Sequence, residues 1–567
     1  MSIPFNSTGL LSYSSSSLGY FYLTHSFEIT TIVLFLFLIL LVINFKLIVR
    51  EFKKIQKKTW IILFLIFILG FWLRNAEYRY GQVFDGYLYI DTAKVLYHNN
   101  LLMEGCGIGN LDSCILYHQP LMTPGHPYLI TLLFKLFGEH DLLAMYLSAF
   151  LSSLTIFLIF FIGYTLFSSE RKGLYAALIF ALISLDILIA PTGSARSTSA
   201  FFLALTLLFY LIALKKDSIK FWSLVAITFS LSIYMRQDNS ILILPLILGL
   251  FIFDYLKKEN FKNFTSIKKT IIYTSKKFFI PVVIFIVTQI PVQHWIWFSH
   301  TNMSLISFEY LKIKLSLMWC TVFFPWIIKS YMFLQSASIL FLSSFLFLPH
   351  LFKSDRKSFN KVIFILIIFF IFFFLVAFYF LPPNGFDYIR QMHPIVIPYA
   401  IITGFVISEL ERISKINQKI FLSLILIIMV IPLVLIFSFK FSYVNIFRDG
   451  RLTTDIPFEF MTAPLIKLIN SAPPNSLIFI SQSAVPSFDL VENNERRWVD
   501  IEMIPADNYN IVKHEIMKSK SSPMYFIEDY RCKNSMDDSC KFIYENFNFI
   551  NYTAIGDFKL YKIEYKS

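Results

Sequence analysis

The sequence predicts a polytopic α-helical membrane protein with a mixed α/β region at its C-terminus. Hydrophobic residues fill 56% of the 567 positions and charged residues only 15%, and the mean hydropathy is +0.63. This apolar share exceeds that of soluble domains. Runs long enough to cross a bilayer recur from residue 29 to residue 441, and from residue 442 onward the composition becomes charged and mixed.

The predicted spans follow from the apolar runs, since a helix needs roughly 20 apolar residues to cross about 30 Å of hydrocarbon. They give about twelve crossings, plus or minus about two because several short runs could be interfacial or re-entrant helices. The spans are Ile29–Val49, Thr59–Leu73, Leu142–Leu166, Leu174–Ala190, Ser199–Leu214, Phe221–Tyr234, Ile241–Tyr255, Phe278–Phe298, Met332–Phe352, Val362–Leu381, Ile395–Ser408 and Ile420–Phe441.

The distribution of Lys and Arg predicts the orientation in the membrane. Six basic residues between Lys46 and Lys58 place that loop in the cytoplasm, and alternate loops further on are also basic. This places the N-terminal tail (1–28), a first large loop (74–141) and the C-terminal region (442–567) outside the cytoplasm, around a membrane domain (29–441). The bias also explains much of the net charge of +13, so nucleic acid is not a predicted partner.

Four of the five cysteines form two local pairs with the same spacing, Cys106 with Cys114 and Cys532 with Cys540. Both pairs fall on the predicted outer side, where disulfides persist, and we predict two disulfides. A metal site built from Cys106, Cys114, His118 and His126 is the alternative.

In the C-terminal region, strand-like and helix-like segments alternate. This pattern predicts a small α/β domain on the extracytoplasmic side. The strands are expected at Leu477–Ser481, Arg496–Ile501, Met524–Glu528 and Lys559–Tyr565, and the helices at Asn508–Lys518 and Asp537–Phe547. The region contains no glycine-rich phosphate loop, nucleophile elbow or zinc-protease helix.

Polar clusters lie at span ends on the outer side. Together they supply carboxylates able to act as a base and cations able to hold an anion, which suits a phosphate-bearing substrate presented from the bilayer. An arginine at a span end can also serve only as a headgroup anchor. The clusters are Asp85 with Asp91; Arg196 with Ser197, Thr198 and Ser199; Arg236 with Asp238; and Asp387 with Arg390 and His393.

In their order along the chain, these features resemble the GT-C class of integral-membrane glycosyltransferases. The resemblance is to the branch that holds the protein O-mannosyltransferases and the lipid A aminoarabinose transferases (families 39 and 83). The segments that carry it are FDGYLYIDTAKVL (84–96), HQPLMTPGHPYLITLLFKLFG (118–138), YMRQDNSILILPLI (234–247) and DYIRQMHPIVIP (387–398).

The resemblance implies a donor, an acceptor and residue roles. Asp85 matches the acidic residue of the first loop and is the expected general base, while Arg390 and Arg236 match cations near the donor phosphate. His393 could donate to a phosphate oxygen or satisfy a local polar contact. The donor is a polyprenyl-phosphate monosaccharide drawn from the membrane lipid, the extracytoplasmic acceptor is a protein, lipid or glycan, and transfer inverts the anomeric centre. No cofactor is predicted, and a divalent metal stays an open alternative.

The chain departs from this family in its second external loop, where relatives carry an acidic residue and ARSTSA (195–200) has none. Asp91 or Asp238 could substitute as a secondary acid. The alternative for Asp91 is the solvated face of a surface helix, because six residues place it about 240° around the helix from Asp85.

Two other functions stay open. A multi-pass transporter or flippase of lipid-linked sugars would need two similar halves and ionisable residues near the midplane, and the sequence shows no half-chain repeat. A non-catalytic membrane assembly protein would keep the topology without depending on Asp85 and Arg390.

Overall fold

The computed structural model describes the helical membrane region and most strands of the C-terminal region. The described residues are 17–75, 86–103, 105–109, 116–117, 123–253, 277–291, 355–378, 392–414, 458–480, 496–501, 522–528, 538–555 and 558–566, with shorter stretches between 341 and 352, between 420 and 452, and at residue 532. The predicted residues Asp85, Cys114, Arg390 and the predicted helix Asn508–Lys518 lie outside this set.

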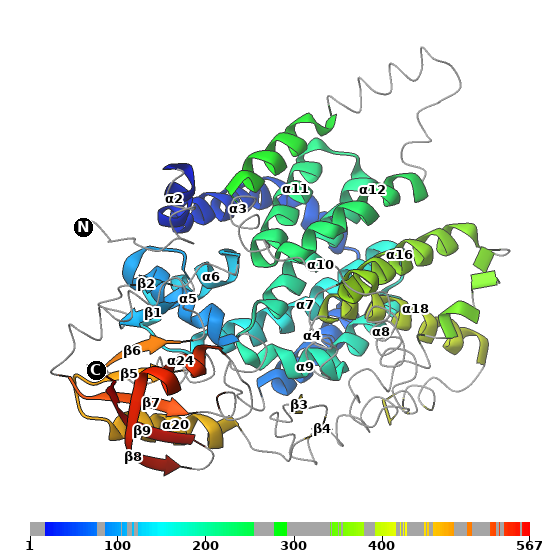
Figure 1. Ribbon diagram of the computed structural model, residues 1–567. Coiled ribbons are helices and arrows are strands. Elements are labelled where there is room, and N and C mark those ends of the chain that lie inside the picture. Colours follow the sequence, from blue (N-terminus) through cyan, green and yellow to red (C-terminus); the bar gives the residue numbers. More distant parts are fainter. Residues whose placement is uncertain are drawn as a thin grey trace.

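Helices dominate the described chain (Figure 1). Their bounds are α2 Ser17–Thr24, α3 Ser26–Phe52, α4 Lys57–Asn75, α5 Gly86–Asn99, α6 Gly125–Phe137, α7 Leu142–Phe167, α8 Glu170–Leu182, α9 Ser184–Ile189, η2 Ala190–Thr192, α10 Ala195–Lys216, α11 Ile219–Met235, η3 Gln237–Leu242, α12 Ile243–Ile252, α16 Arg356–Phe378, η6 His393–Ile395, α18 Val396–Ser414, α20 Phe458–Ser471 and α24 Asp538–Asn546.

Six described helices are long and apolar enough to cross a membrane. A seventh crossing is made if α8 and the α9–η2 segment, which are bent relative to each other, count as one span. Three shorter apolar helices follow the predicted runs at Ile219–Met235, Gln237–Ile252 and Lys277–Pro291. The chain is therefore a multi-pass membrane protein. The predicted runs at 332–352 and 420–441 lie largely outside the described residues, so the count of twelve stays a prediction.

Burial separates the central helices from the peripheral ones. In α10 and in the η6–α18 segment, 89% and 94% of the apolar window is buried, against 17% in α3. The side chains of α3 therefore face lipid along most of its length. Helix α18 approaches α8 closely because residue 404 is glycine, and a Cβ there would overlap the backbone of Ala176.

Ion pairs join the helices at the bundle end where α3 and α18 finish. Lys215 Nζ lies 2.6 Å from Glu51 Oε2, and Lys172 Nζ lies 2.7 Å from Glu409 Oε1. Lys215 lies in the last turn of α10 and Lys172 in the first turn of α8, next to loops that the sequence predicts on one side of the membrane. The helix ends that the positive-inside rule predicts on the same side of the membrane therefore do lie at the same end of the bundle.

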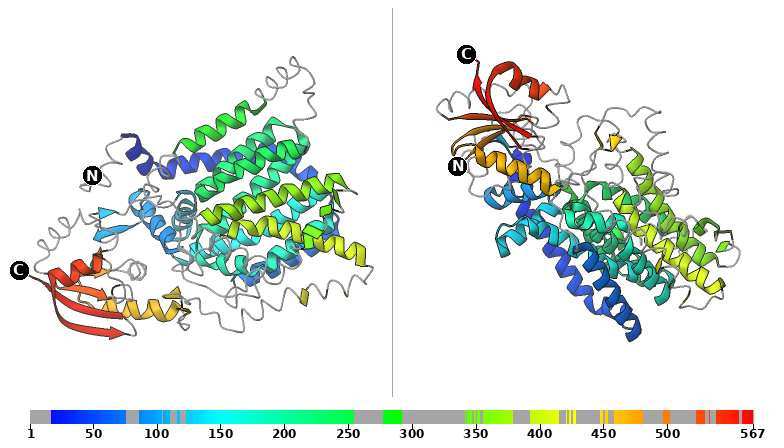
Figure 2. Two further views of the ribbon diagram at one scale, coloured as in Figure 1. Left: turned by 45° about the vertical axis from the view of Figure 1, so that its right-hand side comes forward. Right: turned by 90° about the horizontal axis from the view of Figure 1, so that it is seen from below.

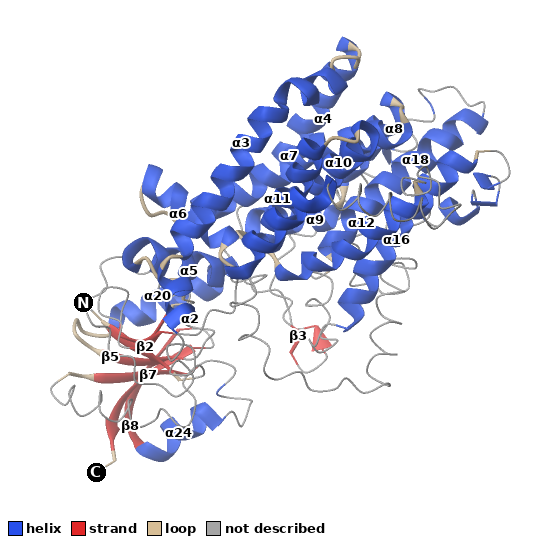
Figure 3. Cartoon of the chain, turned by 90° about the horizontal axis from the view of Figure 1, so that it is seen from above, coloured by secondary structure: helices blue, strands red, loops and turns tan. Residues whose placement is uncertain are grey.

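A seven-stranded sheet lies at one end of the bundle, as Figures 2 and 3 show. Its strands run in the order β2-β1-β6-β5-β7-β9-β8, with β5 parallel to β6 and β7 and the other pairs antiparallel. The bounds are β1 Cys106–Gly109, β2 Leu116–Tyr117, β5 Leu477–Ile480, β6 Arg497–Asp500, β7 Met524–Glu528, β8 Phe547–Ile555 and β9 Phe558–Tyr565; β3 (Phe447–Arg448) and β4 (Arg451–Leu452) form a separate pair.

Helices cover both faces of this sheet. Leu468 of α20 belongs to a core with Ile478 and Ile527. On the other face, Phe542 of α24 packs near Phe547, whose ring centre lies 5.1 Å from that of Phe479. The four predicted strands are all present as β5, β6, β7 and β9, and the helix predicted at 537–547 is α24.

Two of the seven strands come from the loop after α5, which the sequence did not predict. Strand β1 pairs with β6 through Ile108 opposite Val499, and the indole Nε1 of Trp498 donates to the carbonyl of Cys106 at 2.8 Å. The first loop and the C-terminal region therefore share one sheet.

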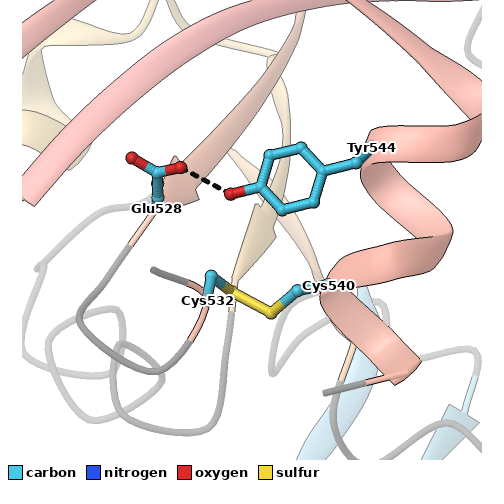
Figure 4. Close-up of a disulfide and its surroundings, with 4 residues drawn as sticks. All are labelled: Glu528, Cys532, Cys540 and Tyr544. Atoms are coloured by element: carbon cyan, nitrogen blue, oxygen red, sulfur yellow. Dashed lines mark hydrogen bonds between the residues drawn. A yellow bond between two sulfur atoms is a disulfide. The ribbon is translucent and has the colours of Figure 1, made fainter. Parts of the chain in front are cut away.

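The predicted disulfide between Cys532 and Cys540 is confirmed, and it closes a short loop between β7 and α24. Figure 4 shows Tyr544 of α24 donating its hydroxyl to Glu528 at the end of β7, at 2.5 Å. Cys106 is also disulfide-bonded. Its pairing with Cys114 stays a prediction, because Cys114 lies outside the described residues.

Candidate active site

A buried ion pair between Arg74 and Asp186 joins the end of α4 to α9. Arg74 Nη2 lies 2.5 Å from Asp186 Oδ2, and both side chains are fully buried. The guanidinium also donates to the backbone carbonyls of Gly70, Phe180 and Ala181 at 3.0 to 3.1 Å. Such complete hydrogen bonding is what makes a buried charge tolerable.

Asp186 holds two further groups. Ser152 Oγ of α7 donates to Asp186 Oδ2 at 2.5 Å, and His393 Nε2 lies 2.7 Å from Asp186 Oδ1. One carboxylate thus connects α4, α7, α9 and the start of η6. The position of α9 makes this possible, because the apolar segment bends by 52° between α8 and α9.

A second cluster is organised by His126 at the start of α6. Its Nε2 lies 2.8 Å from the carbonyl of Gly193, and its Nδ1 lies 2.9 Å from Thr198 Oγ1. Since a carbonyl only accepts, Nε2 carries the hydrogen and Nδ1 accepts from Thr198. Burial lowers the pKa of His126 to about 4, so the ring is neutral at pH 7.

The His126 cluster brings the first turn of α5 to the start of α10. The ring of Tyr89, four residues after Asp85, meets the ring of His126 edge-on at 5.2 Å. Beside it, a Cβ on Gly125 would lie 2.6 Å from the carbonyl oxygen of Tyr234, so only glycine lets α6 approach the end of α11 this closely. Helices α5, α6, α10 and α11 therefore meet here.

The predicted pair Arg236 and Asp238 follows directly after α11. Arg236 Nη2 lies 2.7 Å from Asp238 Oδ2, and the two side chains are 12% and 11% exposed. Arg196, in the first turn of α10, interacts electrostatically with the same carboxylate. Two guanidinium groups therefore lie near one carboxylate, and guanidinium groups are the side chains best suited to hold an anion such as phosphate.

The two clusters lie one helical turn apart along α7. Ser148 Oγ donates to the carbonyl of Ser194 at 3.2 Å, beside the start of α10, and Ser152 donates to Asp186. Four residues of α-helix correspond to about 6 Å of rise. The structure thus stacks the Asp186 cluster close to the His126 cluster.

The other predicted residues fall as follows. Asp85 lies immediately before Gly86, the first described residue of α5. Asp85 and Arg390 themselves are outside the described residues.

Asp91 is 5% exposed, and its carboxylate lies against Gly105. The alternative of a solvated face for Asp91 is therefore wrong. Thr198 and Ser199, which stand where the resemblance implies an acidic residue, hydrogen-bond to His126 and Asn239 respectively.

Asp186 was not among the residues predicted from the sequence. A sequence signal for it was present, because Asp186 is the only carboxylate in the apolar run 174–190, and ionisable residues inside spans are functional or paired.

Among the described residues there is no group of three side chains able to hold a metal. The metal site considered as an alternative from the sequence would use Cys106 and His126 as ligands. Cys106 is disulfide-bonded, and both ring nitrogens of His126 already form hydrogen bonds.

Comparisons with known proteins agree with this architecture. Residues 118–295 match the family of dolichyl-phosphate-mannose-protein mannosyltransferases. No curated protein matches the chain.

Solved structures share the fold at low sequence identity. ArnT from Cupriavidus metallidurans in the apo state has a TM-score of 0.52 at 11% identity, over 89% of this chain and 97% of that one. ArnT from the same organism bound to undecaprenyl phosphate has a TM-score of 0.50 at 11% identity, over 90% and 98%.

The archaeal oligosaccharyltransferase AglB from Archaeoglobus fulgidus, in complex with an inhibitory peptide and a dolichol-phosphate, has a TM-score of 0.51 at 12% identity, over 90% of this chain and 74% of that one. The resemblance inferred from the sequence is thus confirmed: residues 118–295 match the mannosyltransferase family, and the chain has the fold of the GT-C membrane glycosyltransferases.

Proposed function

We propose that the protein transfers a monosaccharide from a polyprenyl-phosphate donor to an extracytoplasmic acceptor, with inversion at the anomeric carbon. Two comparisons support a lipid-linked donor. The matching family is named for a dolichyl-phosphate sugar, and the ArnT and AglB structures are described with undecaprenyl phosphate and dolichol-phosphate.

One observation carries the proposal for this chain. His126 holds the α5 turn that follows Asp85 beside the start of α10, where Arg196 and Arg236 surround Asp238. Asp85 then acts as general base on the acceptor, removing its proton as it attacks the anomeric carbon. The bond to the donor phosphate breaks, and the negative charge moves to the phosphate.

The arginine side chains act on the leaving group, which is the donor phosphate. Arg236 and Arg390 bind the donor phosphate and offset the charge that develops on the leaving group. His393 donates its Nε2–H to Asp186, and donation from Nδ1 to a phosphate oxygen requires that this second ring nitrogen also carries a hydrogen. The basic loops orient these groups, with the tail 1–28 and the region 442–567, toward the extracytoplasmic side.

The test compares wild type with Asp85→Asn in detergent, using a labelled polyprenyl-phosphate sugar and mass spectrometry of retained lipid. Both proteins should retain the donor, and only wild type should turn it over. The matched control is Asp355→Asn in the loop before α16, which should transfer sugar at the wild-type rate. Undiminished transfer by Asp85→Asn would remove Asp85 as base, and failure of both proteins to bind the lipid would remove the donor assignment.

A transporter of lipid-linked sugars is the second candidate, because the Arg74–Asp186 pair is the kind of buried charge that transporters place inside their spans. Movement of donor across sealed vesicles without sugar transfer would favour it. Sugar transfer by detergent-solubilised protein, where no two compartments exist, would favour the enzyme.

A further inference from the structure

A pocket of about 570 Å³ lies between the first turns of α3 and the ends of α5 and α6, apart from the clusters described above. Glu28 and Ile32 line it from α3, His98 and Asn100 from the end of α5, and Lys135 from α6. Figure 3 shows α6 beside α3. The volume falls in the range of small-ligand sites.

Exposed apolar side chains place the pocket at the membrane surface. Ile32 and Phe35 of α3 are 66% and 62% exposed, and Leu136 and Phe137 at the end of α6 are 72% and 65% exposed. Such residues contact lipid, and Glu28 lies one turn before Ile32 at the start of the span. The polar part of the pocket is therefore at the depth of lipid headgroups and its apolar part at the depth of acyl chains.

The pocket holds two opposite charges that do not neutralise each other. The ammonium of Lys135 lies 3.7 Å from the ring centre of Phe27, and Glu28 accepts from the Asn100 amide at 3.1 Å. Within the described part of the chain, neither charge forms an ion pair. His98 is already paired with Glu139 at 2.6 Å.

We propose that this pocket binds a phospholipid with a phosphoethanolamine headgroup. The headgroup phosphate lies against Lys135, its primary ammonium donates to Glu28, and the acyl chains follow Ile32 into the bilayer. An anionic headgroup would meet Glu28 with like charge. A trimethylammonium headgroup has no N–H to donate to the Glu28 carboxylate. A bound lipid would connect α3 to the loop helices α5 and α6.

The test is lipid competition, independent of any transferase activity. The protein is placed in nanodiscs holding equal amounts of phosphatidylethanolamine, phosphatidylglycerol and phosphatidylcholine, then released for native mass spectrometry. We expect wild type to retain one phosphatidylethanolamine. Lys135→Gln should reduce this retention roughly three- to tenfold, as expected for losing one partly exposed charge-assisted contact. Glu28→Gln should shift the preference toward phosphatidylglycerol.

Lys541→Gln and Glu545→Gln are matched controls, because this exposed pair lies on α24 and should leave retention unchanged. Since the pocket charges are themselves exposed, their variants should fold. Equal retention of the three lipids by wild type, or no change in either pocket variant, would overturn the proposal.

Discussion

Asp186 Oδ2 lies 2.5 Å from Arg74 Nη2, with both side chains completely buried, although 112 residues separate them along the chain. The pair connects the end of α4 to the bend between α8 and α9, and Ser152 and His393 complete the carboxylate's hydrogen bonds. These contacts fix the helices beside the candidate active site.

Replacing Asp186 by asparagine should destabilise the protein by about 3–5 kcal/mol, because Arg74 is left as a buried charge without compensation. The double variant Arg74→Leu with Asp186→Leu should be less damaging, since no charge stays buried. Thermal unfolding in detergent measures both. A single variant that melts like wild type would show that the pair carries no net stability.

His126 should make stability depend on pH. Its pKa is about 4 in the folded protein against about 6.5 when unfolded, so the folded state stays neutral while the unfolded state takes up a proton. The contribution is complete above pH 6.5 and is lost as pH falls from 6.5 toward 4, to a total on the order of 3 kcal/mol.

The measurement is the melting temperature at pH 7.5 and at pH 5, for wild type and His126→Gln. Wild type should lose more than the variant, because glutamine does not titrate. Equal losses would mean that His126 gains its proton in the folded protein as easily as in the unfolded one.

Arg236→Gln should raise the KM for a polyprenyl-phosphate donor on the order of tenfold, because a charge-assisted contact to the phosphate is lost. Asp238→Asn should not raise it, since the two arginines then keep their full charge. Arg171→Gln, an exposed arginine at the other end of the bundle, serves as control. An unchanged KM in Arg236→Gln would remove this residue from the donor site.

Trp498→Phe should loosen the strand that the first loop adds to the sheet, because the hydrogen bond from the indole to Cys106 is lost at a cost of about 1–2 kcal/mol. Hydrogen exchange of residues 106–109 should quicken, while that of β8 and β9 should stay unchanged. Trp60→Phe on α4 is the control. Unaltered exchange at β1 would show that the strand pairing alone holds the loop.

Removing the Cys532–Cys540 disulfide with two serines should lower the stability of the sheet region by about 2–3 kcal/mol, as a loop of this length implies. Peptide mapping without reductant should show the linked pair in wild type, and Cys320→Ser should leave it intact. Free thiols at both positions in protein from an oxidising compartment would contradict the assignment.

Local sequence patterns, namely apolar runs and strand-like alternation, predicted much of the fold. The apolar runs match the observed spans at α3, α4, α7 and α10 within a few residues, because a bilayer selects length and hydropathy directly. Four strands and the helix α24 were also predictable, since alternation and turn residues are local properties.

The tertiary contacts were not predictable in the same way. The sequence did not indicate that Arg236 forms an ion pair with Asp238, and neither strand β8 nor helix α20 was predicted. Asp186 was missed because its partners come from three other helices and no periodicity reports them.

The sequence by itself determined that the chain is a multi-pass membrane protein, where several of its membrane helices and four of its strands lie to within a few residues, and which family it resembles. Only the tertiary structure decided that the first loop completes the C-terminal sheet, that Asp186 holds Arg74 and His393, and that His126 joins α5 to α10. The physical reason is that burial and propensity act on neighbouring residues, whereas a buried ion pair or a strand pairing is selected by packing between segments a hundred or more residues apart.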